Sequence, residues 1–403
     1  MPRRTLHALH IIPRGIWALG FVSMFMDISS EMIHSLLPLF LVSVLGASPT
    51  ALGLLEGFAE GTVNIVKVLS GALSDWLGKR KALALLGYGM AALTKPLFPL
   101  ANSFGLVFVA RLIDRIGKGV RGAPRDALVA DLAPQEVRGA SYGLRQSLDT
   151  IGAFAGPLAS ICLMLGFKGD FRSVFWVAVI PAFVSVGLLA LFVHEPPDSV
   201  KPLRTRPPFH WRELQHYSRA FWFVVAIGSV FTLARFSEAF LILRASNLGL
   251  RNEYAPLVLV VMNAVYATSS YPAGHLSGRV DRRLVLAVGG GALVLADVLL
   301  ATATGVVGLT AGISFWGLHM GFSQGLLAAL VADAAPIDRR GNAFGFFSLV
   351  SGIVLLSASV LAGVLWDQIG AAATFYTGAS FAALGVVGLL LQLRSTPSTT
   401  TPD

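Results

Sequence analysis

The sequence predicts an all-α integral membrane protein with twelve transmembrane helices in two pseudo-symmetric six-helix bundles. Hydrophobic residues make up 55% of the chain and charged residues only 13%, and the mean hydropathy is +0.70. A soluble domain has about a quarter of its residues charged, so this chain cannot cover a water-facing surface. Charge-free runs such as Val298–Ala332 are long enough for the roughly 20-residue helix that crosses a bilayer. The absence of period-2 alternation disfavours a transmembrane β-barrel.

Apolar length, together with breaks at glycine, proline and charged residues, places the spans along the chain. The predicted spans are 15–45, 50–75, 82–101, 103–132, 139–166, 172–193, 220–248, 254–276, 284–303, 308–333, 341–366 and 371–393. Basic residues gather in alternate loops, for example Lys79, Arg80 and Lys81 after the second span. The positive-inside rule places these loops and both termini in the cytoplasm. The net charge of +9 follows from this bias and indicates no nucleic-acid partner.

The two halves of the chain repeat one pattern. VADLAPQEVRGASYG at 129–143 matches VADAAPIDRRGNAFG at 331–345, which lies half a chain length further on. The proline-rich segment 194–211 has no spanning pattern and is expected to be an extended linker. The expected parts are an N-terminal bundle at 1–193, a cytoplasmic linker at 194–219 and a C-terminal bundle at 220–403. A parallel repeat is expected of two bundles that rock around a central site.

Three motifs resemble signatures of the major facilitator superfamily of secondary transporters. GALSDWLGKRKAL at 71–83 resembles its loop signature between helices two and three, and RIGKGVRGA at 115–123 resembles its fourth-helix signature. GAFAGPLAS at 152–160 resembles the fifth-helix signature Gly-x-x-x-Gly-Pro of proton-driven exporters. The resemblance covers the whole chain and implies the twelve-helix fold with a cytoplasmic gate. The gating candidates are Gly71, Asp75, Gly78, Lys79, Arg80, Asp131, Arg138, Gly152, Gly156 and Pro157. The resemblance further implies an ion network of Asp75, Lys79 and Asp131.

Ionisable residues recur inside the predicted spans, where each costs about 2.5–3.5 kcal/mol at a helix centre. Spacings of three, four and seven residues place each group on one helix face. The candidate proton- and substrate-binding residues are Asp27, Glu31, His34, Glu56, Glu60, Arg111, Asp114, Arg115, Lys118, Arg145, Asp149, Arg235 and Glu238. These faces cannot point to lipid, so we expect them to line the interior between the halves. Gly117, Gly119 and Gly122 are expected to allow the close helix contacts that this packing needs.

Two explanations of these charges stay open. Six acids and six bases in the first five spans allow complete structural pairing. Neighbouring carboxylates also repel each other, which favours protonation of one of them near physiological pH and an exchange of that proton for substrate. We favour proton exchange for Glu31, because Ser30-Glu31 recurs as Ser237-Glu238. Arg125 and Asp126, near the cytoplasmic end of the fourth span, are expected to belong to the gate.

The second half carries few charges at membrane depth. Beyond the seventh span, Asp297 stands out among apolar and aromatic residues such as Phe315 and Trp316. One ionic wall and one apolar wall fit an amphiphilic organic solute better than a hydrated ion. We therefore predict a proton-coupled exporter of such a solute, working by alternating access. Its expected partners are the small-molecule substrate, protons and the lipid bilayer, and it is expected to be a monomer in the bacterial inner membrane.

The sequence also allows other functions to be considered. A divalent transition-metal transporter (Ni, Fe or Zn) is an alternative, because Asp27, Glu31 and His34 offer oxygen and nitrogen donors on one face. An organic-anion transporter of the same fold is another. An enzyme would need a nucleophile–base pair or a His-rich motif, and an ATP-driven transporter would need a GxxxxGK[ST] phosphate loop; neither pattern is visible. The single Cys162 excludes a cysteine cluster, and no cofactor or resident metal is expected.

Overall fold

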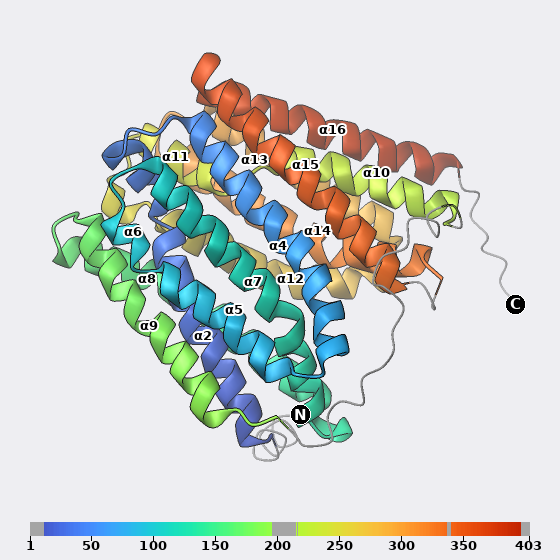
Figure 1. The fold of residues 1–403 in the computed structure, drawn as a ribbon. Helices are drawn as coiled ribbons and strands as arrows, with labels where there is room; N and C mark the ends of the chain where they lie inside the picture. The colour runs from blue at the N-terminus through green and yellow to red at the C-terminus, as the bar shows by residue number, and fades with distance from the viewer. Residues whose placement is uncertain (1–11, 196–214, 216, 337–339, 396–403) are drawn as a thin grey trace, which may run out of the picture. The chain divides into compact units, whose positions relative to one another are not determined.

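Regular structure in the described part of the chain is entirely helical (Figure 1). The structure, a computed structural model, describes residues 12–195, 215, 217–336 and 340–395, with all side chains in these ranges except those of Ala72, Asp75, Arg394 and Ser395. The expected all-α fold is confirmed. Most of the segment expected to be the linker, 196–214, lies outside the described residues.

Twelve long helices and several short ones follow one another along the described residues. The long helices are α2 (Arg14–His34), α4 (Pro49–Leu77), α5 (Arg80–Thr94), α7 (Phe104–Leu132), α8 (Arg138–Gly166), α9 (Phe171–Phe192), α10 (Arg219–Ala234), α12 (Leu257–Ser277), α13 (Arg282–Thr302), α14 (Val306–Ala334), α15 (Arg340–Gln368) and α16 (Ala371–Ser395). The short elements are α3 (Leu37–Leu39), η1 (Phe40–Val44), α6 (Leu97–Leu100), η2 (Gln135–Val137), α11 (Ala239–Asn247) and η4 (Asn252–Tyr254).

Length and hydropathy make this a multi-pass membrane protein. Within the described residues, nine helical segments are long and apolar enough to cross a membrane. The helices α4, α7 and α12 are long enough at about 1.5 Å per residue but are less apolar. On α4 and α7 the difference comes from the charged residues that the sequence places inside these spans.

The chain forms two compact units. Unit 1 comprises Met1–Ala47, Phe58–Pro208 and Arg251–Leu257, and unit 2 comprises Ser48–Gly57, Phe209–Leu250 and Val258–Asp403. In unit 1, α2 packs against α8 and α9, and α5 packs against α7 and α9. In unit 2, α10 packs against α15 and α16, and α13 packs against α14 and α16. The pairs α5–α7 and α13–α14 occupy matching places in the two repeats, so the sequence repeat is accompanied by a repeated packing.

Three predicted spans are each divided in the structure. The span 15–45 becomes α2, α3 and η1, and 82–101 becomes α5 and α6. Pro38 and Pro96 lie at these two divisions, where they remove a backbone N–H and clash with the preceding turn. The span 220–248 is divided between α10 and α11 at Arg235–Glu238, without a proline or glycine.

Hydrogen bonds at helix starts explain several boundaries. Asp170 precedes α9, and its carboxylate accepts hydrogen bonds from the backbone N–H groups of Arg172 at 3.1 Å and Ser173 at 3.3 Å. Ser103, Ser218 and Asp281 cap α7, α10 and α13 in the same way. These side chains satisfy amides that have no partner inside the helix.

Replacement of Asp170 with alanine should loosen the first turn of α9. Loss of an N-cap costs about 1 kcal/mol, so the amides of Arg172 and Ser173 should exchange with solvent about fivefold faster. Hydrogen exchange measured by mass spectrometry checks this. Asp170→Asn keeps an acceptor oxygen and is the matched control; equal acceleration in both variants would contradict the cap.

The stabilisation of α9 by the Asp170 cap should depend on pH. The hydrogen bond from the Ser173 hydroxyl, aided by the two backbone N–H groups, lowers the pKa of Asp170. A lowered pKa means that the cap stabilises α9 above the ordinary value of about 4 and loses this effect as pH falls through the folded-state pKa. The difference between the native protein and Asp170→Ala should therefore shrink in acid.

Candidate functional site

A chain of ion pairs crosses the interior of unit 1. Lys95 directly follows α5, and its Nζ lies 2.9 Å from Asp114 Oδ1 of α7 and 3.1 Å from the hydroxyl oxygen of Ser30 on α2. The second oxygen of Asp114 lies 3.8 Å from Arg115 Nε. Arg115 Nη1 then lies 3.3 Å from Glu60 Oε1 of α4. We name Glu60, Lys95, Asp114 and Arg115 the central charge chain; its lysine, aspartate and arginine are at most 2% exposed.

Small residues bring the helices of this chain close together. A Cβ on Gly87 of α5 would stand 2.6 Å from the carbonyl oxygen of Gly117 on α7, and a Cβ on Gly117 would stand 2.6 Å from that of Gly87. A Cβ on Gly119 would stand 2.7 Å from Val66 Cβ of α4. No other residue type allows backbones to approach so closely. The close contact expected at Gly117 and Gly119 is therefore found; Gly122 faces the methylene groups of Lys67 at 3.6 Å or more.

A second group of charges joins α7 to α8. Arg145 Nη1 lies 2.8 Å from Asp149 Oδ2, one turn along α8, and 3.6 Å from Asp126 Oδ1 of α7. Arg125 Nη1 lies 3.9 Å from Asp149 Oδ2 and donates to the hydroxyl of Ser23 on α2 at 3.1 Å. Arg125 and Asp126, which the sequence assigns to the gate, thus share ion pairs with two of the predicted binding residues.

The two carboxylates of α2 lie directly against the backbone of α8. A Cβ on Gly152 would stand 3.0 Å from Asp27 Cβ, and a Cβ on Gly156 would stand 2.7 Å from Glu31 Cβ. Glu31 Oε2 lies 3.3 Å from Nδ1 of His34. The glycines of the Gly-x-x-x-Gly-Pro motif therefore have a structural role in unit 1: they let α8 pack on the turn of α2 that carries the acids.

Asp27 differs from the other acids of this interior. It is half-buried and makes no hydrogen bond or ion pair with any described residue. Its electrostatic neighbours include Asp149, Lys118 and Arg121. Lys118 is likewise half-buried and makes no hydrogen bond or ion pair with described residues. A carboxylate without a fixed partner can bind or release a proton without breaking an ion pair.

The remaining predicted binding residues are spread over both units. Arg111 is buried on α7, one turn before Arg115. Glu56 is buried one turn before Glu60, in the part of α4 that belongs to unit 2. Arg235 and Glu238 lie in unit 2, at the division between α10 and α11.

The loop motif of unit 1 forms a different ion pair from the predicted network. The guanidinium of Arg80 pairs with Asp131 and donates to Ala127 O at 3.3 Å. The side chain of Asp75 lies outside the described residues, and Lys79 is exposed. Arg138 donates to Ala130 O at 3.2 Å. Three further gating candidates are seen in the backbone and packing: Gly78 has a φ of +63°, Gly71 faces Ala123 Cβ at 3.4 Å, and Pro157 lies buried inside α8.

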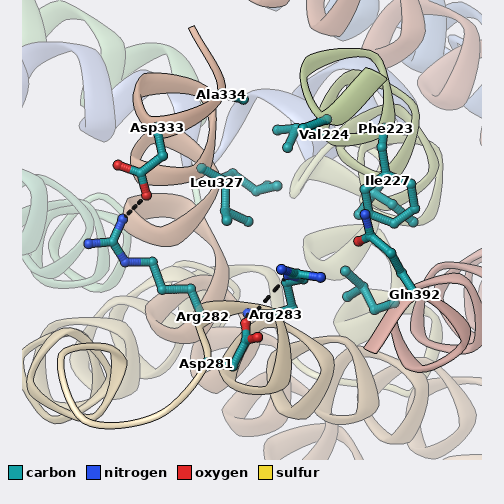
Figure 2. A pocket seen from close by; sticks show the side chains of 13 residues that line it. Phe223, Val224, Ile227, Asp281, Arg282, Arg283, Leu327, Asp333, Ala334 and Gln392 are labelled. Atoms are coloured by element: carbon teal, nitrogen blue, oxygen red, sulfur yellow. Dashed lines mark hydrogen bonds and ion pairs between the residues drawn. The ribbon is translucent and has the colours of Figure 1, made fainter. Parts of the chain in front are cut away.

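Unit 2 repeats the Arg80–Asp131 pair beside a cavity. Arg282 at the start of α13 pairs with Asp333 near the end of α14 (Figure 2). A cavity of about 320 Å³ lies between α10, α13, α14 and α16. Its walls are apolar at Phe223, Ile227 and Leu327, and Figure 2 shows the ion pair at one side. The repeated pair supports a shared role for these loops in holding two helix ends together within each unit.

Sequence reasoning left four residues of this interior out of the predicted binding set. They are Lys95, Arg121, Arg125 and Asp126. The signal for Lys95 was present, because a lysine interrupts an otherwise apolar span. Arg121 stacks over the ring of Tyr88, with 4.7 Å between its Cζ and the ring centroid. Among the described residues, no three His, Cys, Asp or Glu side chains gather to hold a metal ion, so the set Asp27, Glu31 and His34 gains no support as a metal site.

Known proteins resemble this chain along nearly all of its length. The family model described as the Major Facilitator Superfamily matches residues 19–250 and 236–403. An uncharacterised MFS-type transporter of Methanocaldococcus jannaschii is 32% identical over 386 residues, which cover 94% of each chain. The crystal structure of a POT family transporter with a thioalcohol-conjugated peptide gives a TM-score of 0.78 at 13% identity, covering 96% of this chain and 97% of that one. The human organic anion transporter MFSD10 gives 0.63 at 18% identity, covering 93% and 99%. At these identities the two structures show a shared fold.

Replacement of Gly156 with alanine should force α8 away from α2. The added methyl group would stand 2.7 Å from Glu31 Cβ, and such overpacking costs about 1–3 kcal/mol. Thermal unfolding of the purified protein in detergent checks this. Gly143→Ala is the matched control on the same helix, because its Cβ meets nothing within 4 Å. Equal unfolding temperatures for the two variants would show that the close packing is not needed.

Proposed function

Because the chain belongs to the Major Facilitator Superfamily of membrane transporters, we propose that it is a proton-coupled exporter of an amphiphilic organic solute. Transport would proceed by alternating access. The observation that carries the proposal is the half-buried carboxylate of Asp27, which has charged neighbours but no bonded partner among the described residues. The export direction is supported by the resemblance of the Gly152, Gly156 and Pro157 motif to the fifth-helix signature of proton-driven exporters.

We propose Asp27 as the proton-binding residue, in place of Glu31, which the sequence favoured. Glu31 is already hydrogen-bonded to His34, and Glu60 and Asp114 are held by Arg115 and Lys95. A proton on any of these three acids would have to replace an existing contact. Asp27 has none to lose, so it is the acid best suited to exchange a proton for a cationic group of the substrate.

An amphiphilic substrate is supported by the different interiors of the two units. Unit 1 carries the charges described above, whereas the interior of unit 2 contains the aromatic side chain of Phe236 in contact with those of Trp316 and Phe375. A solute with one charged end and one apolar end would suit a transporter that has one charged and one apolar unit. We place the transporter in the cytoplasmic membrane of a bacterium as a monomer with both termini in the cytoplasm.

A second candidate is an organic-anion transporter. It is favoured by Lys118, a half-buried cation that forms no ion pair with described residues. Lys118 would then receive the anionic group, with Asp27 as an electrostatic neighbour. Transport measured in proteoliposomes with an amphiphilic cation and with an organic anion separates the two candidates.

Asp27→Asn should abolish gradient-driven transport without abolishing exchange. In proteoliposomes with an imposed pH gradient, accumulation of the amphiphilic cation ethidium should fall to background, because an amide cannot take up the proton. Counterflow of ethidium, which needs no net proton movement, should persist. Glu31→Gln should reduce accumulation less, because its main partner is His34.

The control is Glu136→Gln, because Glu136 is an exposed acid in η2. This variant should transport ethidium as the native protein does. Undiminished gradient-driven accumulation in Asp27→Asn would overturn the role of this residue. Transport of carboxyfluorescein in place of ethidium would favour the organic-anion candidate.

A further inference from the structure

Asp297 lies in the second half of α13, in unit 2, and is completely buried. Its exposed fraction is 0%, and neither carboxyl oxygen has a hydrogen-bond partner among the described residues. It takes part in no ion pair with them either. An isolated ionised carboxylate in an apolar interior is so costly that such a group takes up a proton instead. Asp297 is therefore a different kind of acid from the paired ones of unit 1.

The helices packed against Asp297 supply no counter-charge. On α14, the ring of His319 faces Gly289 O at 2.9 Å and the hydroxyl of Ser323 at 3.4 Å. On α11, the guanidinium of Arg244 donates to three carbonyl groups at the end of α13. Residues 371–393 of α16 include no charged side chain. Arg235, at the division between α10 and α11, forms no ion pair with Asp297.

The carboxyl group of Asp297 and the backbone carbonyl of Ala234 both lie close to Gly378 of α16. A Cβ built on Gly378 of α16 would stand 2.6 Å from Asp297 Oδ2 and 3.1 Å from the carbonyl oxygen of Ala234. Ala234 is the last residue of α10, and α11 begins only at Ala239. The N–H of Glu238, which would bond to Ala234 O in a continuous helix, does not do so, and no other described backbone N–H reaches it.

Aromatic side chains keep these surroundings apolar. Phe236, within the division, would lie 3.1 Å from the same Cβ on Gly378. Its ring centroid lies 5.5 Å from those of Trp316 and Phe375, and all three side chains are buried. The indole N–H of Trp316 has no acceptor among the described residues, so it does not stabilise a charged Asp297.

We propose that Asp297 is a proton-binding site of unit 2 whose carboxyl O–H donates to the free carbonyl of Ala234. Two oxygens without a proton between them repel each other, whereas a protonated carboxyl group supplies the missing donor. Release of the proton would remove this contact and leave a charge beside a carbonyl oxygen. Proton occupancy is thereby linked to the conformation of the α10–α11 division.

This inference goes beyond the proposed function. It involves none of the unit 1 acids and does not depend on the identity of the solute. Unit 2 would hold its proton in a neutral, closed environment, whereas Asp27 would exchange its proton among charged neighbours. The chain would then have two proton-binding carboxyl groups with different environments, one in each unit.

Infrared spectroscopy of the reconstituted full-length protein tests the proposal. At neutral pH a C=O band of a protonated carboxyl group should be present, and Asp297→Asn should remove the part of it that persists in Asp27→Asn. The matched control is Asp367→Asn, because Asp367 of α15 is exposed and accepts a hydrogen bond from Thr50 N at 2.8 Å. That variant should leave the carboxyl band unchanged. Loss of a carboxylate band in place of a carboxyl band in Asp297→Asn would overturn the proposal.

Two further measurements keep the test decisive. In Asp27→Asn, carboxyl-labelled aspartate should shift the remaining carboxyl band, and an unshifted band would overturn the proposal even if Asp297→Asn fails to fold. Asp297→Leu, which cannot donate to Ala234 O, should unfold at a lower temperature than Asp297→Asn, whose amide can donate; the reverse order would contradict the hydrogen bond. These readouts do not involve transport, so their failure is distinguishable from failure of Asp27 as the coupling acid.

Discussion

The ion pair between Lys95 and Asp114 is the contact on which the interior of unit 1 depends. Both side chains are nearly fully buried at membrane depth, where an unpaired charge would cost several kcal/mol. Their atoms lie 2.9 Å apart, and α5 and α7 also touch through Gly87 and Gly117. Once this pair is formed, the other oxygen of Asp114 faces Arg115, which in turn holds Glu60. These contacts hold together charged side chains from three helices.

We propose that proton exchange takes place at Asp27, an acid outside these ion pairs. Asp27 stands beside the paired groups but is bonded to none of the described residues, so its charge can change while the surrounding ion pairs persist. Asp297 of unit 2 also has no hydrogen-bond or ion-pair partner among the described residues, but it is completely buried. The two units repeat a helix packing and an Arg–Asp pair, but they differ in how they accommodate an acid inside the membrane.

Hydropathy and charge patterning predicted most of the fold, because membrane helices are specified by long apolar runs. They also predicted the charged faces, since each follows from helical spacing along one span. The sequence could not show which acid pairs with which base, because six acids and six bases allow many pairings. The pairing of Asp114 with Lys95 depends on how closely α5 and α7 approach. The division at Arg235–Glu238 was equally hidden. It lacks the proline that marks the divisions at Pro38 and Pro96, and the packing of Phe236 against Trp316 and Phe375 accompanies it.

A double-mutant cycle on Lys95 and Asp114 tests the central claim most directly. Lys95→Met and Asp114→Leu should each destabilise the protein by roughly 3–5 kcal/mol, because Asp114→Leu leaves Lys95 without a counter-charge and Lys95→Met leaves Asp114 with only the more distant Arg115. The double variant should cost far less than the sum of the two. A cycle on the exposed pair Arg251 and Glu253, whose atoms lie 3.0 Å apart, should give a much smaller coupling. Additive effects of Lys95→Met and Asp114→Leu would show that the buried charges do not depend on each other, and would contradict the account.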